Sequence, residues 1–89
     1  HPAHQAFKVM TKFVTKKNGT VVYKDIVNNR RIMTKTTVDY DFDGEPTYTT
    51  VLYKFYKGRY VGVRCEFDDK SVESGVRYII ALAIIYNEI

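Results

Sequence analysis

Alternation of apolar and polar residues, repeated in five segments, constrains the fold of this chain more than any other feature. A period of two is typical of β-strands, because successive side chains point to opposite faces of a sheet. The five expected strands cover residues 7–16, 20–27, 30–41, 47–56 and 59–67. Short turn-forming pairs, among them Asn18-Gly19, Asn28-Asn29 and Asp43-Gly44, separate several of them. We therefore expect an antiparallel meander of about five strands.

Turn length predicts which residues of neighbouring strands face each other. A two-residue loop at Asp43-Gly44 pairs Thr36 with Val51 and keeps the apolar faces together. In the last hairpin, a two-residue turn would place Val61 opposite Lys54, whereas a three-residue loop pairs Val61 with Tyr53. The three-residue loop is favoured because its pairing is apolar.

The period changes after residue 67, and the chain ends in an expected helix of about five turns. Apolar residues follow helical spacing at Val72, Val76, Ile79, Ile80, Ala83 and Ile84. Asp68, Asp69 and Ser71 are possible N-caps, and Glu73 lies near the positive end of the helix dipole. The alternative is a strand over 77–86, since β-branched residues lower helix propensity. The prediction is an α+β fold, with the helix packed on one face of the sheet.

The chain of 89 residues suits one domain, expected at 7–89 after a flexible tail of 1–6. Its 45% hydrophobic and 27% charged residues argue against intrinsic disorder. The longest apolar run, 78–86, is too short to cross a bilayer, which takes about 20 residues. A single cysteine allows no internal disulfide and no multi-cysteine zinc site, which favours a reducing, cytoplasmic location.

A second apolar stripe on the expected helix predicts a homodimer. Tyr78, Leu82, Ile85 and Ile89 recur at spacings of four, three and four. One sheet covers a single stripe, and burying a second stripe adds much to the folding stability of a domain of this size. The alternative is a curved sheet that covers both stripes within one chain.

Charge is distributed unevenly along the sequence. Residues 1–37 carry eight cations and one anion, residues 38–50 carry four anions and no cation, and residues 51–89 are nearly balanced at six cations and five anions. This asymmetry favours a basic surface that meets an anionic partner. The alternative is a charged surface that only keeps the protein in solution.

The predicted solvent face of the sheet combines cations with tyrosines. The candidate binding residues are Lys8, Lys12, Lys16, Arg31, Lys35, Lys54 and Arg64, with Tyr48 and Tyr60. Cations neutralise phosphates and flat rings stack on unpaired bases, so single-stranded DNA or RNA is the expected partner. An ordinary solvated sheet face is the alternative.

Two further motifs match turns better than sites. Residues 39–44 resemble the opening of a calcium loop, but Thr50 stands where the bidentate glutamate belongs and no helix flanks the segment. An acidic hairpin turn without a metal is therefore expected. Residues 18–20 match a glycosylation sequon and also a hairpin turn, and the turn is favoured outside secreted proteins.

No catalytic constellation or cofactor motif is present in the sequence. Cys65 falls on the expected core side of its strand, and the two histidines, His1 and His4, lie in the expected tail. The leading hypothesis is a small non-catalytic binding protein. The alternative is an interaction or inhibitor protein, such as one encoded by a phage or mobile element, that masks a protein target.

Overall fold

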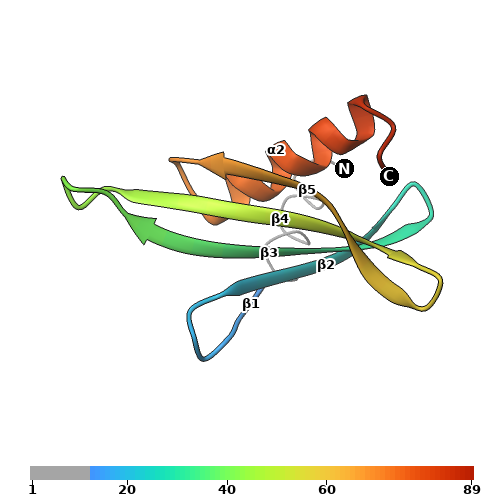
Figure 1. The fold of residues 1–89 in the computed structure, drawn as a ribbon, viewed down its shortest axis with the longest axis horizontal. Coiled ribbons are helices and arrows are strands. Elements are labelled where there is room, and N and C mark those ends of the chain that lie inside the picture. The colour runs from blue at the N-terminus through green and yellow to red at the C-terminus, as the bar shows by residue number, and fades with distance from the viewer. Residues whose placement is uncertain (1–12) are drawn as a thin grey trace, which may run out of the picture.

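The computed structural model describes residues 13–89 as an antiparallel sheet with one helix packed against it (Figure 1). The elements are β1 (Phe13–Thr15), β2 (Val21–Val27), β3 (Arg30–Tyr40), β4 (Pro46–Tyr56), β5 (Arg59–Asp68) and α2 (Val72–Ile85). The five strands lie in sequence order. The predicted α+β meander is confirmed, and the segment 72–85 is a helix rather than a strand. The expected tail and most of the expected first strand lie outside the described residues.

Two of the tight turns contain two residues with positive φ. Asn28 (φ 52°) and Asn29 (φ 63°) join β2 to β3, and Lys57 (φ 49°) and Gly58 (φ 84°) join β4 to β5. This geometry twists in the same sense as the strands it connects, which makes it the preferred two-residue hairpin. The prediction of a turn at 28–29 is confirmed, whereas the preference for a three-residue loop after β4 is wrong.

The β3–β4 register differs by one residue from the prediction. Gly44 (φ 78°) donates its N–H to the carbonyl of Asp41 at 3.0 Å, and Asp41 donates to Glu45 at 3.0 Å. These bonds close a loop of three residues instead of two, so Thr36 faces Thr50 and not Val51. Because side chains alternate, this slip moves every residue of β4 to the face opposite to the expected one.

The β1–β2 turn deviates from its prediction in the same way. Gly19 (φ 88°) donates to the carbonyl of Lys16 at 3.0 Å, and Lys16 donates to Thr20 at 2.7 Å. The loop therefore holds three residues, and the register places Phe13 opposite Tyr23. Asn18 accepts the Thr20 N–H on its side-chain oxygen at 3.0 Å, which supports the turn interpretation of this segment.

A bulge in β5 compensates for the short turn that precedes it. Val61 pairs with Lys54, the mismatch that argued against a two-residue turn. The register then shifts between Leu52 and Tyr53, so that Gly62 faces Tyr53 while Arg64 faces Leu52. The extra residue is Val63, which packs against the core. Arg64 consequently lies on the same face as Leu52.

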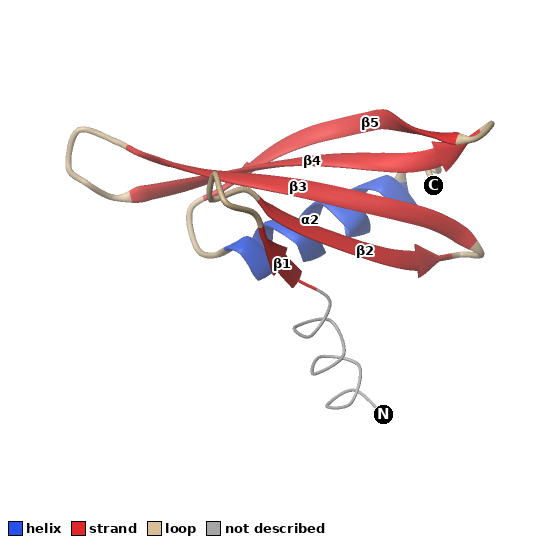
Figure 2. Cartoon of the chain, turned by 90° about the horizontal axis from the view of Figure 1, so that it is seen from below, coloured by secondary structure: helices blue, strands red, loops and turns tan. Residues whose placement is uncertain are grey.

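The core lies between α2 and the strands β3, β4 and β5 (Figure 2). Ile32, Leu52, Ile79 and Ala83 are fully buried in it. Gly75 brings the helix close to the sheet, because a Cβ at this position would lie 3.1 Å from the Thr50 hydroxyl oxygen. The small side chain of Thr50 therefore lies beneath the helix at this point.

Both ends of α2 are capped. Of the three expected N-cap candidates, Ser71 is the N-cap and accepts the Ser74 N–H on its hydroxyl at 3.0 Å. At the other end Asn87 (φ 58°) donates to Ile84 at 3.1 Å and Glu88 donates to Ala83 at 2.7 Å, a Schellman arrangement. This reversal directs the last residues back to the sheet, where Ile89 packs against the core.

Within residues 13–89, α2 is too short to cross a lipid bilayer.

Candidate nucleic-acid interface

The face of the sheet that α2 does not cover carries cations and aromatic rings. Figure 2 shows this face, with α2 behind the strands. It presents Lys24 from β2, Arg31 and Lys35 from β3, Tyr53 and Phe55 from β4, and Tyr60 from β5. We call these six residues the open-face cluster. The three cations are exposed and the three rings are partly exposed.

Each cation of the cluster lies over one of its rings. The Arg31 guanidinium carbon is 4.2 Å from the centre of the Phe55 ring, and Lys35 Nζ is 5.5 Å from that of Tyr53. Lys24 Nζ is 5.8 Å from the centre of the Tyr60 ring. A ring face attracts a cation electrostatically, and this contact uses none of the N–H donors of the cation. The cations are therefore positioned by the rings, and their donors remain directed at solvent.

Tyr60 and Lys24 approach each other across the sheet, although β3 and β4 separate their strands. They line a shallow hollow together with Asp25, Ile26, Arg31 and Ile32, so one carboxylate lies beside its cations. Phe55 packs edge-on against Tyr60, with ring centres 5.1 Å apart and planes at 70°. The edge-to-face pair holds both rings in place beside the hollow.

The open face is positively charged where the cluster lies. No ion pair within residues 13–89 involves Lys24, Arg31 or Lys35. On this face of the described strands the acidic residue is Asp39, near the far end of β3. A patch of unpaired cations on partly apolar walls attracts anions more strongly than scattered surface charges do.

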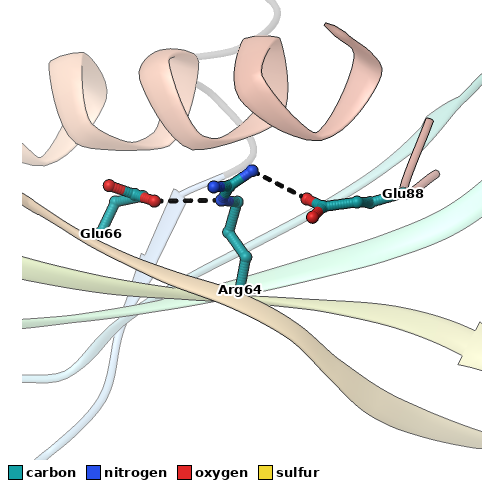
Figure 3. Close-up of polar contacts among 3 residues, drawn as sticks. All are labelled: Arg64, Glu66 and Glu88. Carbon is teal, nitrogen blue, oxygen red and sulfur yellow. Dashed lines mark hydrogen bonds and ion pairs between the residues drawn. The ribbon is translucent and has the colours of Figure 1, made fainter. Parts of the chain in front are cut away.

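Arg64 does not belong to this surface, contrary to the prediction. It lies beneath α2 between two carboxylates (Figure 3). Its Nε donates to Glu66 at 3.0 Å and its Nη1 donates to Glu88 at 2.9 Å. Burial lowers the pKa of Arg64, but hydrogen bonds and charges from Glu66 and Glu88 outweigh it and leave that pKa above its ordinary value. Arg64 thus ties the end of the chain to the sheet.

The structure divides the other predicted binding residues between several places. Lys54 lies on the helix side of β4, where its Nζ is 5.8 Å from the Tyr56 ring centre. Tyr48 is on the same side, opposite Val38 and Asp68. Lys16 is exposed in the β1–β2 loop, and Lys8 and Lys12 lie outside the described residues.

Arg31, Lys35 and Tyr60 are therefore the predicted residues that the open face unites. Lys24, Tyr53 and Phe55 also belong to this face but were not among the predicted binding residues. For Lys24 the signal was the two-residue turn at Asn28-Asn29, which pairs Lys24 with Met33 on the solvent side of β3. For Tyr53 and Phe55 it was the length of the β3–β4 loop, because the register it sets decides which alternate residues of β4 face solvent. The same error concerned Cys65, expected in the core and found exposed on the open face.

The acidic segment between β3 and β4 forms a turn, as expected. One carboxylate oxygen of Asp41 accepts the backbone N–H groups of Asp43 and Glu45, each at 2.9 Å. Within residues 13–89, no group of three or more His, Cys, Asp or Glu side chains is placed to hold a metal ion.

The expected dimer stripe is only partly exposed. Tyr78 (49% exposed) and Ile85 (68%) face solvent, whereas Leu82 is partly covered and Ile89 packs against the core. Ile84 and Tyr86 are exposed beside Ile85. The outer apolar surface of α2 therefore lies nearer the end of the helix than predicted.

No family model, no curated protein and no solved structure matches this chain.

Proposed function

We propose that this protein is a non-catalytic module that binds single-stranded nucleic acid through the open-face cluster. The observation that carries the proposal is the seating of three cations, which form no ion pair within residues 13–89, on three aromatic rings of one uncovered sheet face. Cys65 is exposed and forms no disulfide, which favours a reducing compartment, such as the cytoplasm, as the place where the protein acts.

The chemistry of the cluster matches an unpaired strand in two ways. Ammonium and guanidinium groups neutralise phosphates, and a guanidinium whose plane is fixed by a ring loses less freedom on binding. Tyrosine and phenylalanine stack on bases of any sequence, provided that the bases are not already stacked in a duplex. We therefore expect weak sequence preference and a strong preference for single strands.

Fluorescence anisotropy with labelled oligonucleotides of about 15 nucleotides tests the proposal, in single-stranded and duplex forms of DNA and RNA. Three phosphate contacts to a single strand predict that log K falls with log salt at a slope of about −2. Tyr60→Ala should weaken single-strand binding by roughly 1 to 3 kcal/mol and duplex binding by less.

Charge reversal supplies a matched pair of variants. Lys35→Glu should weaken binding strongly, because it removes one phosphate contact and adds a repulsive charge. Lys70→Glu makes the same change in the exposed β5–α2 connection and should leave binding nearly unchanged. Absence of any complex at low salt would contradict the proposal.

A second function, masking of a protein target, is favoured by the β3–β4 loop. Phe42 is fully exposed at its tip, and Tyr40 beside the loop is 71% exposed. Exposed aromatic anchors are typical of protein interfaces. A stoichiometric, salt-insensitive protein complex that is lost on Phe42→Ser would favour this function over nucleic-acid binding.

We also propose that two copies associate through the outer surface of α2. Tyr78 and Ile85 are exposed on it, and Ile84 and Tyr86 are exposed at its borders. Covering one Ile or Leu side chain stabilises the associated pair by roughly 1.5 to 3 kcal/mol, which is large compared with the folding free energy of a small domain. Sedimentation velocity tests this association.

A further inference from the structure

The two chemical types of the open-face cluster start from separate pairs of strands, and each cation reaches over a ring of the other pair. The cations come from β2 and β3, and the rings come from β4 and β5. Because the strands lie in sequence order, the backbone positions of the two types form two rows that run side by side across the sheet. A nucleic-acid strand also has two sides, since phosphates follow one edge and bases project from the other.

Resting on the proposed function, we infer that the site takes a short single-stranded segment of about four nucleotides that lies along β3. Its phosphates lie over β2 and β3, and its bases point toward β4 and β5. The segment ends before Asp39, which makes Asp39 the residue that limits the length of the site.

The spacing of the cations sets this length. Arg31 and Lys35 are four residues apart on β3, so their backbone positions are separated by about 13 Å at the rise of a strand. A stacked nucleic-acid strand advances about 3.4 Å per nucleotide, so roughly four nucleotides span the same distance. Lys24 faces Met33, between these two residues on the neighbouring strand, and supplies the intermediate cation.

The row of cations is followed by carboxylates. Asp39 occupies the same face of β3 four residues beyond Lys35, and Thr37 between them is neutral. Asp41, Asp43 and Glu45 are exposed in the loop beyond it. A phosphate that advanced past Thr37 would meet negative charge instead of a cation, so binding further nucleotides brings no gain.

The aromatic row offers an internal control. Phe67 lies on the open face of β5 and is 68% exposed, opposite Thr49. It therefore continues the row of rings beyond the end of the row of cations. If the cations define the site, Phe67 takes no part in binding although its ring is the most accessible on this face.

A length series of oligothymidines, from two nucleotides to about 15, tests the inference by the slope of log K against log salt. This slope counts phosphate contacts and does not depend on the number of binding registers. We expect it to steepen up to about four nucleotides and then to stay near −2. A slope that keeps steepening past roughly −3 with length would overturn the inference and leave the proposed function standing. If no oligonucleotide binds, both the inference and the proposed function are wrong.

Two pairs of variants complete the test. Asp39→Lys should lengthen the site, so that the slope for a long oligonucleotide steepens by about 0.7, whereas Glu73→Lys on α2 makes the same charge change without this effect. Tyr53→Ala should weaken binding about fivefold or more, and Phe67→Ala less than about twofold. An equal loss from both aromatic variants, or an equal steepening from both lysine variants, contradicts the inference.

Discussion

Three buried threonines show how single hydroxyl groups contribute to this fold. Thr36 and Thr50 share a hydrogen bond of 2.9 Å under the helix, whereas the fully buried Thr34 hydroxyl has no partner within residues 13–89. Thr34→Val should therefore stabilise by about 1 kcal/mol, because it removes an unsatisfied polar group. Thr36→Val should destabilise by about 1 to 2 kcal/mol, because it leaves Thr50 unpaired.

Thermal unfolding checks this pair, since 1 kcal/mol shifts the Tm of such a domain by about 4 to 8 °C. The two variants make the same chemical change on adjacent positions of one strand face. Shifts of the same sign in both would contradict the assignment of the hydroxyl groups.

At the scale of the element, the start of α2 depends on an ionised Asp68. Burial raises the pKa of this carboxyl group, but the backbone N–H groups of Ser71 and Lys70 and the Ser74 hydroxyl outweigh it. The pKa of Asp68 in the folded protein is therefore below its ordinary value. A carboxylate of this kind stabilises the fold above the unfolded-state pKa of about 3.9, and the stabilisation is lost as pH falls through the folded-state pKa.

Asp68→Asn should consequently lower the urea midpoint at neutral pH, and its difference from the unmodified protein should shrink below about pH 4. Asp69→Asn is the control, because none of these hydrogen bonds involves Asp69. A difference between Asp68→Asn and the unmodified protein that stays constant down to pH 2 would show that the charge of Asp68 does not support the helix.

At the scale of the molecule, the fold places basic residues at one end of the long strands and acidic residues at the other end. The β2–β3 and β4–β5 turns lie at one end of the long strands, with Arg30, Lys57 and Arg59, and the acidic β3–β4 loop lies at the other. The outer surface of α2 carries exposed apolar residues, among them Tyr78 and Ile85, beside the ion pair of Arg77 with Glu73. The two proposed partners, a nucleic acid and a second copy, therefore use different faces and do not compete.

Sedimentation velocity at micromolar concentration should give a species of twice 10.4 kDa for the unmodified protein. Ile85→Glu should reduce it to the single-chain mass, because a charge on the apolar surface of α2 cannot be buried without a large penalty. Ile26→Glu changes an isoleucine of similar exposure, 66% against 68%, on the open face and should leave the dimer intact. A mass of 10.4 kDa for the unmodified protein would exclude the dimer.

The sequence by itself determined the elements of this protein, because their signals are local. Alternation marked the strands, the positive-φ preference of Asn28-Asn29 marked a turn, and the N-cap candidates Asp68, Asp69 and Ser71 marked the start of the helix. Each depends on residues within a few positions of one another, so no knowledge of packing was required.

Only the tertiary structure decided which residues share a face. A loop at Asp43-Gly44 can hold two or three residues at similar local cost, and one residue of difference exchanges the faces of β4. The bulge at Val63 makes a second exchange in β5. The close approach of α2 at Gly75 accommodates Thr50 and leaves Tyr53 and Phe55 on the open face. The open-face cluster follows from this packing, which brings together residues from four strands.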